Sequence, residues 1–333
     1  RPTGPPPIPG LAEAPHFTNE TLFANRVLPA HLVVIGGGPV GLEMAQAHRR
    51  LGARVTVLEA GRILARDDRE LVDIVARRLA REGIEVREGA AIARIERHGE
   101  GAAAILADGT RIEASHLLVA TGRMPTVDGL ALDVAGIAHT GRGITVDDHL
   151  RTSNRNVWAI GDVNGRHAFT HMAGHEASLF VRGALFRLPA RLEADHVPWC
   201  TYTDPELAQV GLSEAEARAR HGAAVRVLRA DLADNDRART ARLEEGLVKV
   251  VTGPRGRVLG AAIAAPGAGE LIQPWCLAVQ RGLKVSALAG FVPPYPTLGE
   301  ASKRAAGTYY AATVFGPRAR RLVRLLARLP VFG

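Results

Sequence analysis

The sequence predicts an α/β domain built on parallel strands, followed by an α+β domain with an antiparallel sheet. Three observations support this fold class. The chain has 333 residues, more than one hydrophobic core usually serves. Residues 31–60 follow a strand, glycine turn, helix, strand pattern, which is a β-α-β unit. From about His196 onward, short apolar strands alternate with turns and helices, as in α+β domains.

The composition narrows the class of protein. The hydrophobic share of 47% is ordinary, and no apolar run approaches the ~20 residues of a membrane span, so we expect a soluble, cytoplasmic protein. Cys200 and Cys276 have neither a redox-pair nor a metal-ligand spacing, which suits a reducing compartment and predicts no metal site. The net charge of +8 is mostly arginine spread along the chain, which indicates a compositional bias rather than a nucleic-acid partner.

The β-α-β unit contains a G-x-G-x-x-G turn at Gly36, Gly38 and Gly41. Gly36 permits the tight turn, Gly38 lets a pyrophosphate approach the backbone, and Gly41 lets helix and strand pack closely. Gly37 belongs to the same turn, and the following helix offers free N–H groups and a partial positive charge. The strand before the turn and the helix after it make this pattern specific, and it predicts a dinucleotide site.

Glu59 closes the second strand of this unit, where an acidic side chain can accept hydrogen bonds from both ribose hydroxyls of an adenosine. A 2′-phosphate there meets like charge, at a cost of about 1 to 4 kcal/mol at ~4 Å. We therefore expect NAD(H) to be preferred over NADP(H). Arg62 keeps this preference moderate, because its guanidinium can receive a phosphate.

The remaining elements of the first half follow in order. A helix is predicted over about 67–82, and an Asp-Gly pair at 108–109 predicts a hairpin turn. Residues 31–124 are thus expected to form one nucleotide domain with an antiparallel excursion. Its further strands are predicted within 84–88, 90–98, 101–114 and 116–125.

Further strands are predicted in the second half. An apolar strand is expected in NVWAIGDV (156–163), ending in Gly161 and Asp162. The strands of the α+β domain are predicted near 197–203, 225–230, 246–252 and 257–264.

Four segments in this order resemble the flavoprotein disulfide reductase family, which includes dihydrolipoamide dehydrogenase, glutathione reductase and mercuric reductase. They are IGGGPVGLE (35–43), ATGRMP (120–125), TSNRNVWAIGDV (152–163), and TDPELAQVG (203–211) followed by YPTLGE (295–300). The resemblance implies a Rossmann-like NAD-binding domain, the remainder of an FAD domain, and an α+β dimerisation domain. The boundaries it implies are 1–30 for the exit from the FAD domain, 31–124 for NAD(H), 125–194 for the returning FAD part, 195–308 for dimerisation and 309–333 for a basic tail.

The resemblance also implies roles for individual residues. Gly36, Gly37, Gly38, Gly41 and Glu59 would hold NAD(H), with Gly122 along it, and Glu43 matches a carboxylate near the nicotinamide and flavin. Asp162 after Gly161 matches an acid that bonds the ribityl or phosphate part of FAD, and Thr170 and His171 would begin the helix beside the isoalloxazine. Two plainer interpretations stay open: Glu43 as an exposed helix residue and Asp162 as a strand-end cap.

The stretch PPYPTLGE (293–300) raises a separate question. Prolines keep Tyr295 out of a helix, and Thr297 with Glu300 has the spacing of a capping box. In disulfide-reducing relatives a His stands where Tyr295 is and pairs with the Glu five positions on. A phenol titrates near about 10 rather than about 6.5, so Tyr295 donates a hydrogen bond but is a poor base. We expect Tyr295 and Glu300 to be substrate-site residues in a homodimer, with the capping box as the alternative.

Two departures concern the ends of the family pattern. RPTGPPPIPGL (1–11) matches the exit from the FAD domain, and neither the family's FAD glycine motif nor its C-x-x-x-x-C pair occurs in the chain. We therefore expect the chain to bind NAD(H) and dimerise but to hold FAD weakly. In residues 316–333, leucines at 322, 325, 326 and 329 share a helix face opposite arginines. This tail suits an anionic membrane surface or an acidic groove, or else packs on its own protein.

These observations predict an FAD- and NAD(P)H-dependent oxidoreductase acting on a disulfide, metal ion or other small electrophile as electron acceptor. The alternative is a non-catalytic NAD-binding dimer that acts as an interaction or membrane-associated module.

Overall fold

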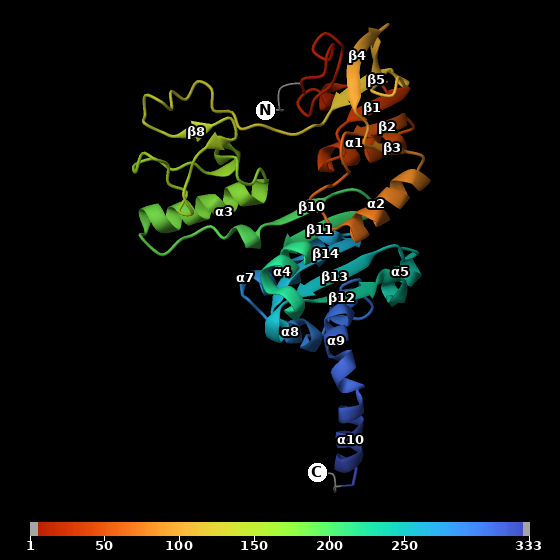
Figure 1. The fold of residues 1–333 in the computed structure, drawn as a ribbon, viewed down its shortest axis with the longest axis vertical. Helices are drawn as coiled ribbons and strands as arrows, with labels where there is room; N and C mark the ends of the chain where they lie inside the picture. The colour runs from red at the N-terminus through yellow and green to blue at the C-terminus, as the bar shows by residue number, and fades with distance from the viewer. Residues whose placement is uncertain (1–5, 329–333) are drawn as a thin grey trace. The chain divides into compact units, whose positions relative to one another are not determined.

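The computed structural model describes residues 6–328. The chain divides into two compact units (Figure 1). Unit 1 contains the described residues up to Ala65 together with Ala76–Val197, and unit 2 contains Arg66–Val75 together with the described residues from Pro198 on. The mixed architecture confirms the predicted fold class, an α/β region on a parallel sheet and an α+β region on an antiparallel sheet.

Unit 1 is built on a four-stranded parallel sheet of order β3-β2-β1-β7. Helix α1 (Pro39–Arg50) connects β1 to β2, which confirms the β-α-β unit. The apolar residues of β1 are buried, as in a strand covered on both faces. The strands are β1 (His31–Ile35), β2 (Arg54–Glu59), β3 (Glu85–Glu88) and β7 (His116–Val119), and helix α2 (Arg69–Arg81) precedes β3.

The antiparallel excursion is a three-stranded sheet of order β4-β5-β6. Gly109 has φ +84° at the hairpin turn, and the Thr110 N–H donates to Asp108 Oδ1 at 2.8 Å, so the Asp-Gly pair forms the predicted turn. Its apolar residues share one core with β1, β2 and β7. The strands are β4 (Ile92–His98), β5 (Gly101–Leu106) and β6 (Arg111–Ala114).

The rest of unit 1 is mostly irregular around helix α3 (Thr170–Phe180). The strand predicted for 156–163 is wrong: Arg151 and Trp158 form an isolated bridge, and residues Gly161–Asn164 form the 3-10 turn η2. A strand needs a neighbour to pair its backbone groups, and within the described residues this segment finds only its own hairpin. The other short elements are η1 (Leu22–Ala24), β8 (His139–Thr140), β9 (Gly143–Ile144), η3 (Val181–Leu185) and η4 (Ala194–His196).

Unit 2 is built on a five-stranded antiparallel sheet of order β10-β11-β14-β13-β12. Four strands were predicted, and β11 was not, although it lies between β10 and β14. The strands are β10 (Pro198–Thr201), β11 (Glu206–Gly211), β12 (Arg226–Asp231), β13 (Leu247–Thr252) and β14 (Val258–Ala265).

Helices cover one face of this sheet and enclose the main core of unit 2. Trp275 on α7 is fully buried there, and its indole N–H donates to Ser302 Oγ of α9 at 3.0 Å. Truncating a side chain of this size in a core costs about 3 to 5 kcal/mol. The helices on this face are α5 (Asp236–Ala241), α6 (Ala268–Leu271), α7 (Gln273–Gln280), α8 (Val285–Gly290) and α9 (Glu300–Val314). Helix α4 (Glu214–His221) packs on the other face, and α10 (Pro317–Leu326) contributes no buried residue. The short turns are η5 (Gly222–Ala224), η6 (Leu232–Asp234) and η7 (Pro254–Gly256).

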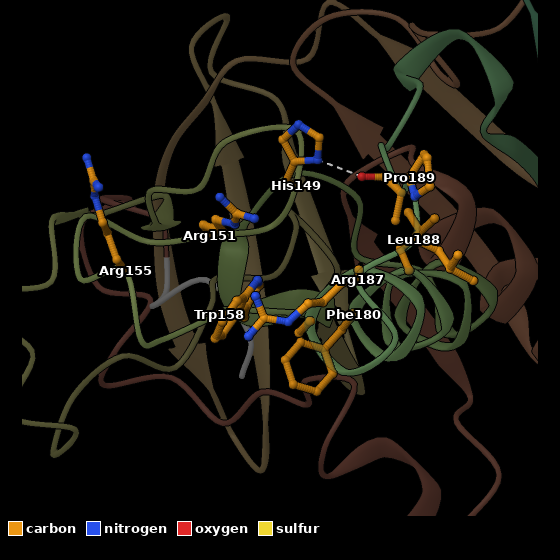
Figure 2. Close-up of a pocket in the computed structure, with 12 residues that line it drawn as sticks. His149, Arg151, Arg155, Trp158, Phe180, Arg187, Leu188 and Pro189 are labelled. Atoms are coloured by element: carbon orange, nitrogen blue, oxygen red, sulfur yellow. Dashed lines mark hydrogen bonds between the residues drawn. The ribbon is translucent and has the colours of Figure 1, made fainter.

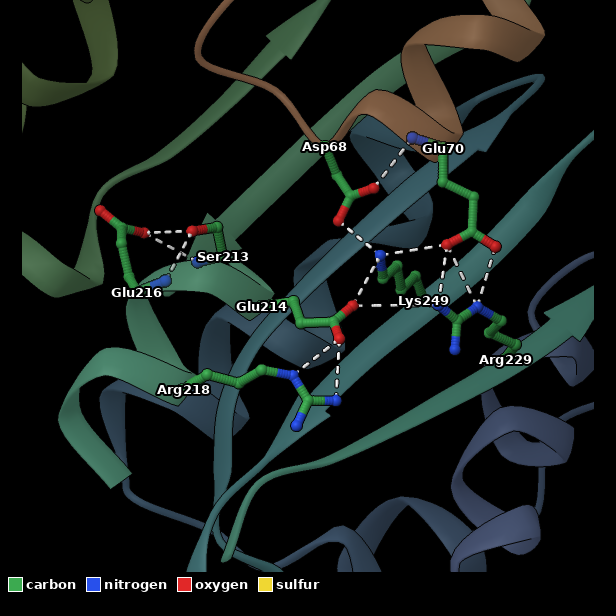
Figure 3. A network of polar contacts seen from close by, with 8 residues as sticks. All are labelled: Asp68, Glu70, Ser213, Glu214, Glu216, Arg218, Arg229 and Lys249. Carbon is green, nitrogen blue, oxygen red and sulfur yellow. Dashed lines mark hydrogen bonds and ion pairs between the residues drawn. The ribbon is translucent and has the colours of Figure 1, made fainter. Parts of the chain in front are cut away.

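The other face of the sheet carries a buried ion-pair network centred on Lys249 of β13 (Figure 3). The Lys249 ammonium lies 2.6 Å from Asp68, 3.0 Å from Glu70 and 3.1 Å from Glu214. Burial alone lowers the pKa of Lys249, but these hydrogen bonds outweigh it and the pKa is raised. Arg229 stands directly opposite Lys249 in the sheet, and Glu70 bonds both cations.

Candidate nucleotide-binding and active site

The glycine turn between β1 and α1 is shaped by steric limits. Gly36 has φ +112°, and a Cβ there would meet the Ala120 carbonyl oxygen at 2.5 Å. A Cβ on Gly41 would overlap the Gly36 carbonyl, and one on Gly37 would meet the Ile63 side chain at 2.6 Å. These positions therefore require glycine for packing reasons alone.

Gly38 differs from the other glycines of the turn. Apart from its chain neighbours and the backbone of its own helix, no atom of residues 6–328 lies within 4 Å of the place where its Cβ would stand, so packing does not explain the glycine. It is the N-cap residue of α1, Pro39 follows at the helix start, and in the described structure no side chain caps the helix. An open approach to uncapped helix amides is the geometry that suits a phosphate group.

The Glu59 carboxylate lies beside this turn. It accepts hydrogen bonds from the backbone N–H groups of Gly37 at 2.7 Å and Gly61 at 2.8 Å. The Leu64 N–H donates in turn to the Gly37 carbonyl, so the acid and the turn are held together. Arg62 is exposed, and within residues 6–328 its guanidinium has no ion pair.

Glu43 and Gly122 belong to elements that adjoin the glycine turn: the helix that follows it and the loop after the neighbouring strand. Glu43 is a half-buried residue of α1, five positions after the N-cap Gly38. Gly122 has φ +133° in the loop that follows β7, the strand paired with β1. The loop and the glycine turn therefore both follow the carboxyl ends of adjacent parallel strands, where open α/β sheets bind ligands.

Asp162 belongs to a polar group in η2. Its carboxylate lies 3.3 Å from Arg123 of the ATGR loop and forms an ion pair with it. The adjacent Gly161 N–H donates to the buried Glu176 carboxylate at 2.7 Å, and the Asn164 amide donates to the same oxygen at 2.8 Å. Glu176 of α3 thus fixes the turn that presents Asp162.

Thr170 and His171 begin α3 and are exposed. Phe169 is the N-cap, and no side chain in the described part of the chain caps the helix. The His171 ring stacks on Phe169 with centroids 5.2 Å apart. The start of α3 therefore offers amide N–H groups, a hydroxyl and an imidazole on one exposed surface.

Tyr295 lies in unit 2 and is 71% exposed. Its hydroxyl donates to Asp236 Oδ2 at 3.1 Å, a partner that sequence reasoning missed. This hydrogen bond, then the Asp236 charge, raises the pKa of the Tyr295 phenol. Tyr295 is therefore a neutral hydrogen-bond donor around neutral pH, as its ordinary titration predicts.

The capping box expected at Thr297 and Glu300 is only half formed. The Glu300 carboxylate accepts from the Thr297 backbone N–H at 3.2 Å, as in such a box. The Thr297 hydroxyl, however, donates to the Pro294 carbonyl at 2.8 Å, and α9 begins at Glu300 with Gly299 as its N-cap. The local proline-rich turn takes the hydroxyl that a full box would use.

The structure brings some predicted residues together and leaves others apart. In unit 1 the glycine turn is hydrogen-bonded to Glu59, and η2 contacts the ATGR loop through the Arg123–Asp162 ion pair. In unit 2, the Tyr295 hydroxyl is hydrogen-bonded to Asp236. Arg123 stands within the quoted ATGRMP segment, so it was visible in the sequence, whereas Asp236 had only its position beside the helix cap Asn235 as a signal.

A separate cavity of about 510 Å³ lies in unit 1 beyond the C-terminal end of α3 (Figure 2). Trp158 and Phe180 form an edge-to-face pair at 5.4 Å on its wall, and Arg151, Arg187 and His149 line it as well. Guanidinium groups and aromatic rings both suit planar anions. None of the predicted site residues lines this cavity.

Residues 6–328 contain no group of three His, Cys, Asp or Glu side chains able to hold a metal ion. Within the same residues, every helix is too short or too polar to cross a membrane.

The parallel sheet with its glycine turn, followed by an antiparallel α+β unit, is an architecture typical of dinucleotide-binding proteins. Two family models match the chain: pyridine nucleotide-disulphide oxidoreductase over residues 1–177, and the dimerisation domain of that family over residues 197–306. The chain belongs to the pyridine nucleotide-disulphide oxidoreductase family, which confirms the resemblance stated from the sequence.

Curated relatives include mercuric reductases. The one from Streptomyces lividans is 37% identical over 309 residues, covering 91% of this chain and 65% of that protein. The one from Shigella flexneri is 37% identical over 313 residues, covering 91% and 54%. The dihydrolipoyl dehydrogenase of Bacillus subtilis is 32% identical over 278 residues, covering 82% and 60%. The chain thus spans about half to two thirds of the length of these relatives.

Solved structures of other proteins are also similar to this chain. The chain is similar to the HOCl-induced flavoprotein disulfide reductase RclA from Escherichia coli, with a TM-score of 0.84 and 30% identity over 92% of this chain and 71% of that one. It is similar to LpdA from Mycobacterium tuberculosis, with a TM-score of 0.83 and 30% identity over 88% and 64%.

Proposed function

We propose that this chain serves an NAD(H)-linked flavoprotein oxidoreductase that reduces a disulfide, a metal ion or another small electrophile. The relatives named above include two mercuric reductases, a dihydrolipoyl dehydrogenase and a flavoprotein disulfide reductase, which supports this reaction class. A bound flavin would supply the chemistry of accepting a hydride and passing electrons on. The residues of the chain would bind the nucleotide, orient the cofactors and donate hydrogen bonds to the acceptor molecule.

The observation that carries the proposal is the open approach at Gly38. Gly36 and Gly41 are fixed by packing, but Gly38 has empty space where a side chain would stand, at an uncapped helix start. A pyrophosphate fits that space and gains the N–H groups and partial positive charge of the helix.

The preference for NAD(H) over NADP(H) is proposed from Glu59. Its carboxylate is tethered by two backbone N–H groups, so it cannot swing away from a phosphate without losing both hydrogen bonds. Arg62, three positions on, is exposed, and its guanidinium can receive a 2′-phosphate, which limits the discrimination between NADH and NADPH.

The residues proposed for FAD fit one part of that cofactor. Asp162 supplies an acceptor, and Thr170, His171 and the α3 amides supply donors. The Arg123 guanidinium pairs with the Asp162 carboxylate at 3.3 Å, so a ligand that binds Asp162 must compete with this ion pair. We propose that these groups form one wall of the site and that the chain alone holds FAD weakly.

On the substrate side, we propose that Tyr295 donates a hydrogen bond to the acceptor molecule and that Asp236 orients its hydroxyl. Glu300 fixes the backbone of the same loop through the Thr297 N–H. Glu43 is proposed to lie along the nicotinamide. The dimerisation match over 197–306 supports a homodimer as the active form.

Isothermal titration with NADH and with NADPH tests the nucleotide site. We expect NADH to bind more tightly than NADPH, and Gly38→Val to abolish binding with an unchanged melting temperature, since its φ of −76° and empty surroundings tolerate a side chain. Gly141→Val is the matched control, because its Cβ also meets open space at a position far from the turn in sequence. A Gly38→Val protein that binds NADH like its parent refutes the site.

Visible absorbance tests the flavin. Protein kept in excess FAD should allow NADH to bleach the flavin band under anaerobic conditions, faster than FAD without protein, whereas desalting should remove most of the flavin. A protein that binds NADH but shows no bleaching at any FAD concentration supports the alternative, a non-catalytic NAD-binding dimer, over the oxidoreductase.

A further inference from the structure

Helix α10 has an apolar face that nothing in the described chain covers. It follows α9 at the end of unit 2, away from the five-stranded sheet (Figure 1). Its large apolar side chains are all exposed: Leu322 56%, Val323 62%, Leu325 60% and Leu326 52%. None of its residues is buried, so the expectation that the tail packs on its own protein finds no support in the described residues. The fourth leucine of the expected face, Leu329, lies outside them.

The two sides of α10 differ in chemistry. Ala319, Leu322, Val323 and Leu326 are spaced i, i+3, i+4 and i+7, which places them in one sector of the helix. Arg321 and Arg324 are spaced i and i+3 and occupy the opposite sector, while Arg318, Arg320 and Leu325 lie at the boundaries between the two. Ten residues give a length of about 15 Å, enough to lie along a surface but not to cross a bilayer.

The charge of this region has one sign. None of residues 301–333 is acidic, and the cations there are Lys303, Arg304, Arg318, Arg320, Arg321, Arg324 and Arg328. Arg304 lies 3.7 Å from Asp234, but no arginine of α10 has an ion pair within residues 6–328. The arginines on α10 are therefore available to an external anion.

We propose that α10 is a membrane-surface helix that lies in the headgroup region of an anionic lipid bilayer. An amphipathic helix with arginines on its polar face and leucines on the other gains from apolar burial and from anionic headgroups together. Packing of α10 against the same helix of a second copy would bring two acid-free basic segments together, so the like charge opposes that occupant. This membrane binding does not depend on the nucleotide site, and it would place the proposed oxidoreductase at a membrane surface.

Vesicle co-sedimentation of the full chain tests the proposal. We expect binding to vesicles of equal phosphatidylglycerol and phosphatidylcholine, little binding to phosphatidylcholine alone, and loss of binding at high salt. Each arginine near the surface contributes about fivefold to binding, so Arg321→Gln with Arg324→Gln should weaken it about 25-fold. Leu322→Asn should weaken it about tenfold or more.

Two controls keep the result decisive. Arg77→Gln with Arg281→Gln removes the same charge from exposed positions outside the tail and should bind vesicles like the parent. The α10 variants should keep the parent's melting temperature, because α10 contributes no buried residue, and the control pair should do so because Arg77 and Arg281 are exposed. Equal binding to neutral and anionic vesicles, or equal losses from the two arginine pairs, overturns the proposal. So does a Leu322→Asn variant that changes the sedimentation coefficient of the oligomer while vesicle binding stays unchanged.

Discussion

Replacing Lys249 with methionine should destabilise unit 2 by about 3 to 5 kcal/mol. The Lys249 side chain is 6% exposed and faces three carboxylates, of which Asp68 is the most buried at 13% exposure. Methionine fills a similar volume, so the loss in unfolding free energy reports the missing ion pairs rather than the creation of a cavity.

The magnitude follows from what each carboxylate retains. Glu70 keeps Arg229 at 2.8 Å, and Glu214 keeps Arg218 at 2.9 Å, so both remain paired and partly solvated. Asp68 loses its cation while buried, and an uncompensated buried charge carries most of the cost. The half-exposed pairs add only about 0 to 1 kcal/mol each.

Urea unfolding followed by tryptophan fluorescence measures the change, and a double-mutant cycle isolates its cause. Asp68→Asn keeps the side-chain oxygen that accepts from the Glu70 N–H at 3.1 Å, so the start of α2 is preserved. Combined with Lys249→Met, it should recover about 2 kcal/mol or more, because no buried charge is left unpaired. If Lys249→Met costs less than about 1 kcal/mol, or if the two changes are additive, the account of this network is wrong.

Three further predictions concern single side chains. Burial raises the pKa of Asp67 from 3.8 to about 6, against the hydrogen bond from Trp199, so the contribution of Asp67 to folding stability is fully present below pH 3.8 and is lost as the pH rises through about 6. Asp67→Asn should remove that loss and raise the unfolding free energy at pH 7 by about 1 to 3 kcal/mol; unfolding curves of equal pH dependence for both proteins would contradict it. Glu59→Gln should narrow the preference for NADH over NADPH about tenfold in titration, with a ratio unchanged from the parent counting against the proposed ribose contact. Tyr295→Phe should lower the rate of acceptor reduction about tenfold while NADH affinity stays constant, and Asp236→Asn should have a smaller effect; equal rates for all three proteins would exclude the proposed donor.

The sequence predicted those parts of the fold whose causes are local. The β-α-β unit at 31–59 has its strands, turn and helix within one short stretch, and the Asp108-Gly109 turn is fixed by its own two residues. The strand expected at 156–163 was wrong because apolar content alone does not supply a pairing partner. Strand β11 was missed although it follows its partner β10 after only four residues, because the polar Glu206 and Gln209 interrupt its apolar pattern and its other partner, β14, comes from a distant part of the chain.

The same division holds for the site. The tasks of Gly36 and Gly41 could be stated from the motif, since close contacts in such turns recur. The Asp236 partner of Tyr295 could not, because 59 residues separate the two in the chain and only the tertiary fold joins them. The Lys249 network likewise collects carboxylates from positions 68, 70 and 214, which no spacing rule connects.

Unit 2 is discontinuous along the chain, and this limits how the protein can be divided. A fragment that starts at Pro198 would lack Arg66–Val75, the segment that brings Asp67 to Trp199 and Asp68 to Lys249. Its sheet would then lose two of the three carboxylates that pair with Lys249, keeping only Glu214, and the acceptor of the Trp199 indole N–H, a poor starting point for independent folding. A split between the two halves should therefore graft that ten-residue acidic segment onto the C-terminal piece, and a gene fusion placed at Val197 should be avoided.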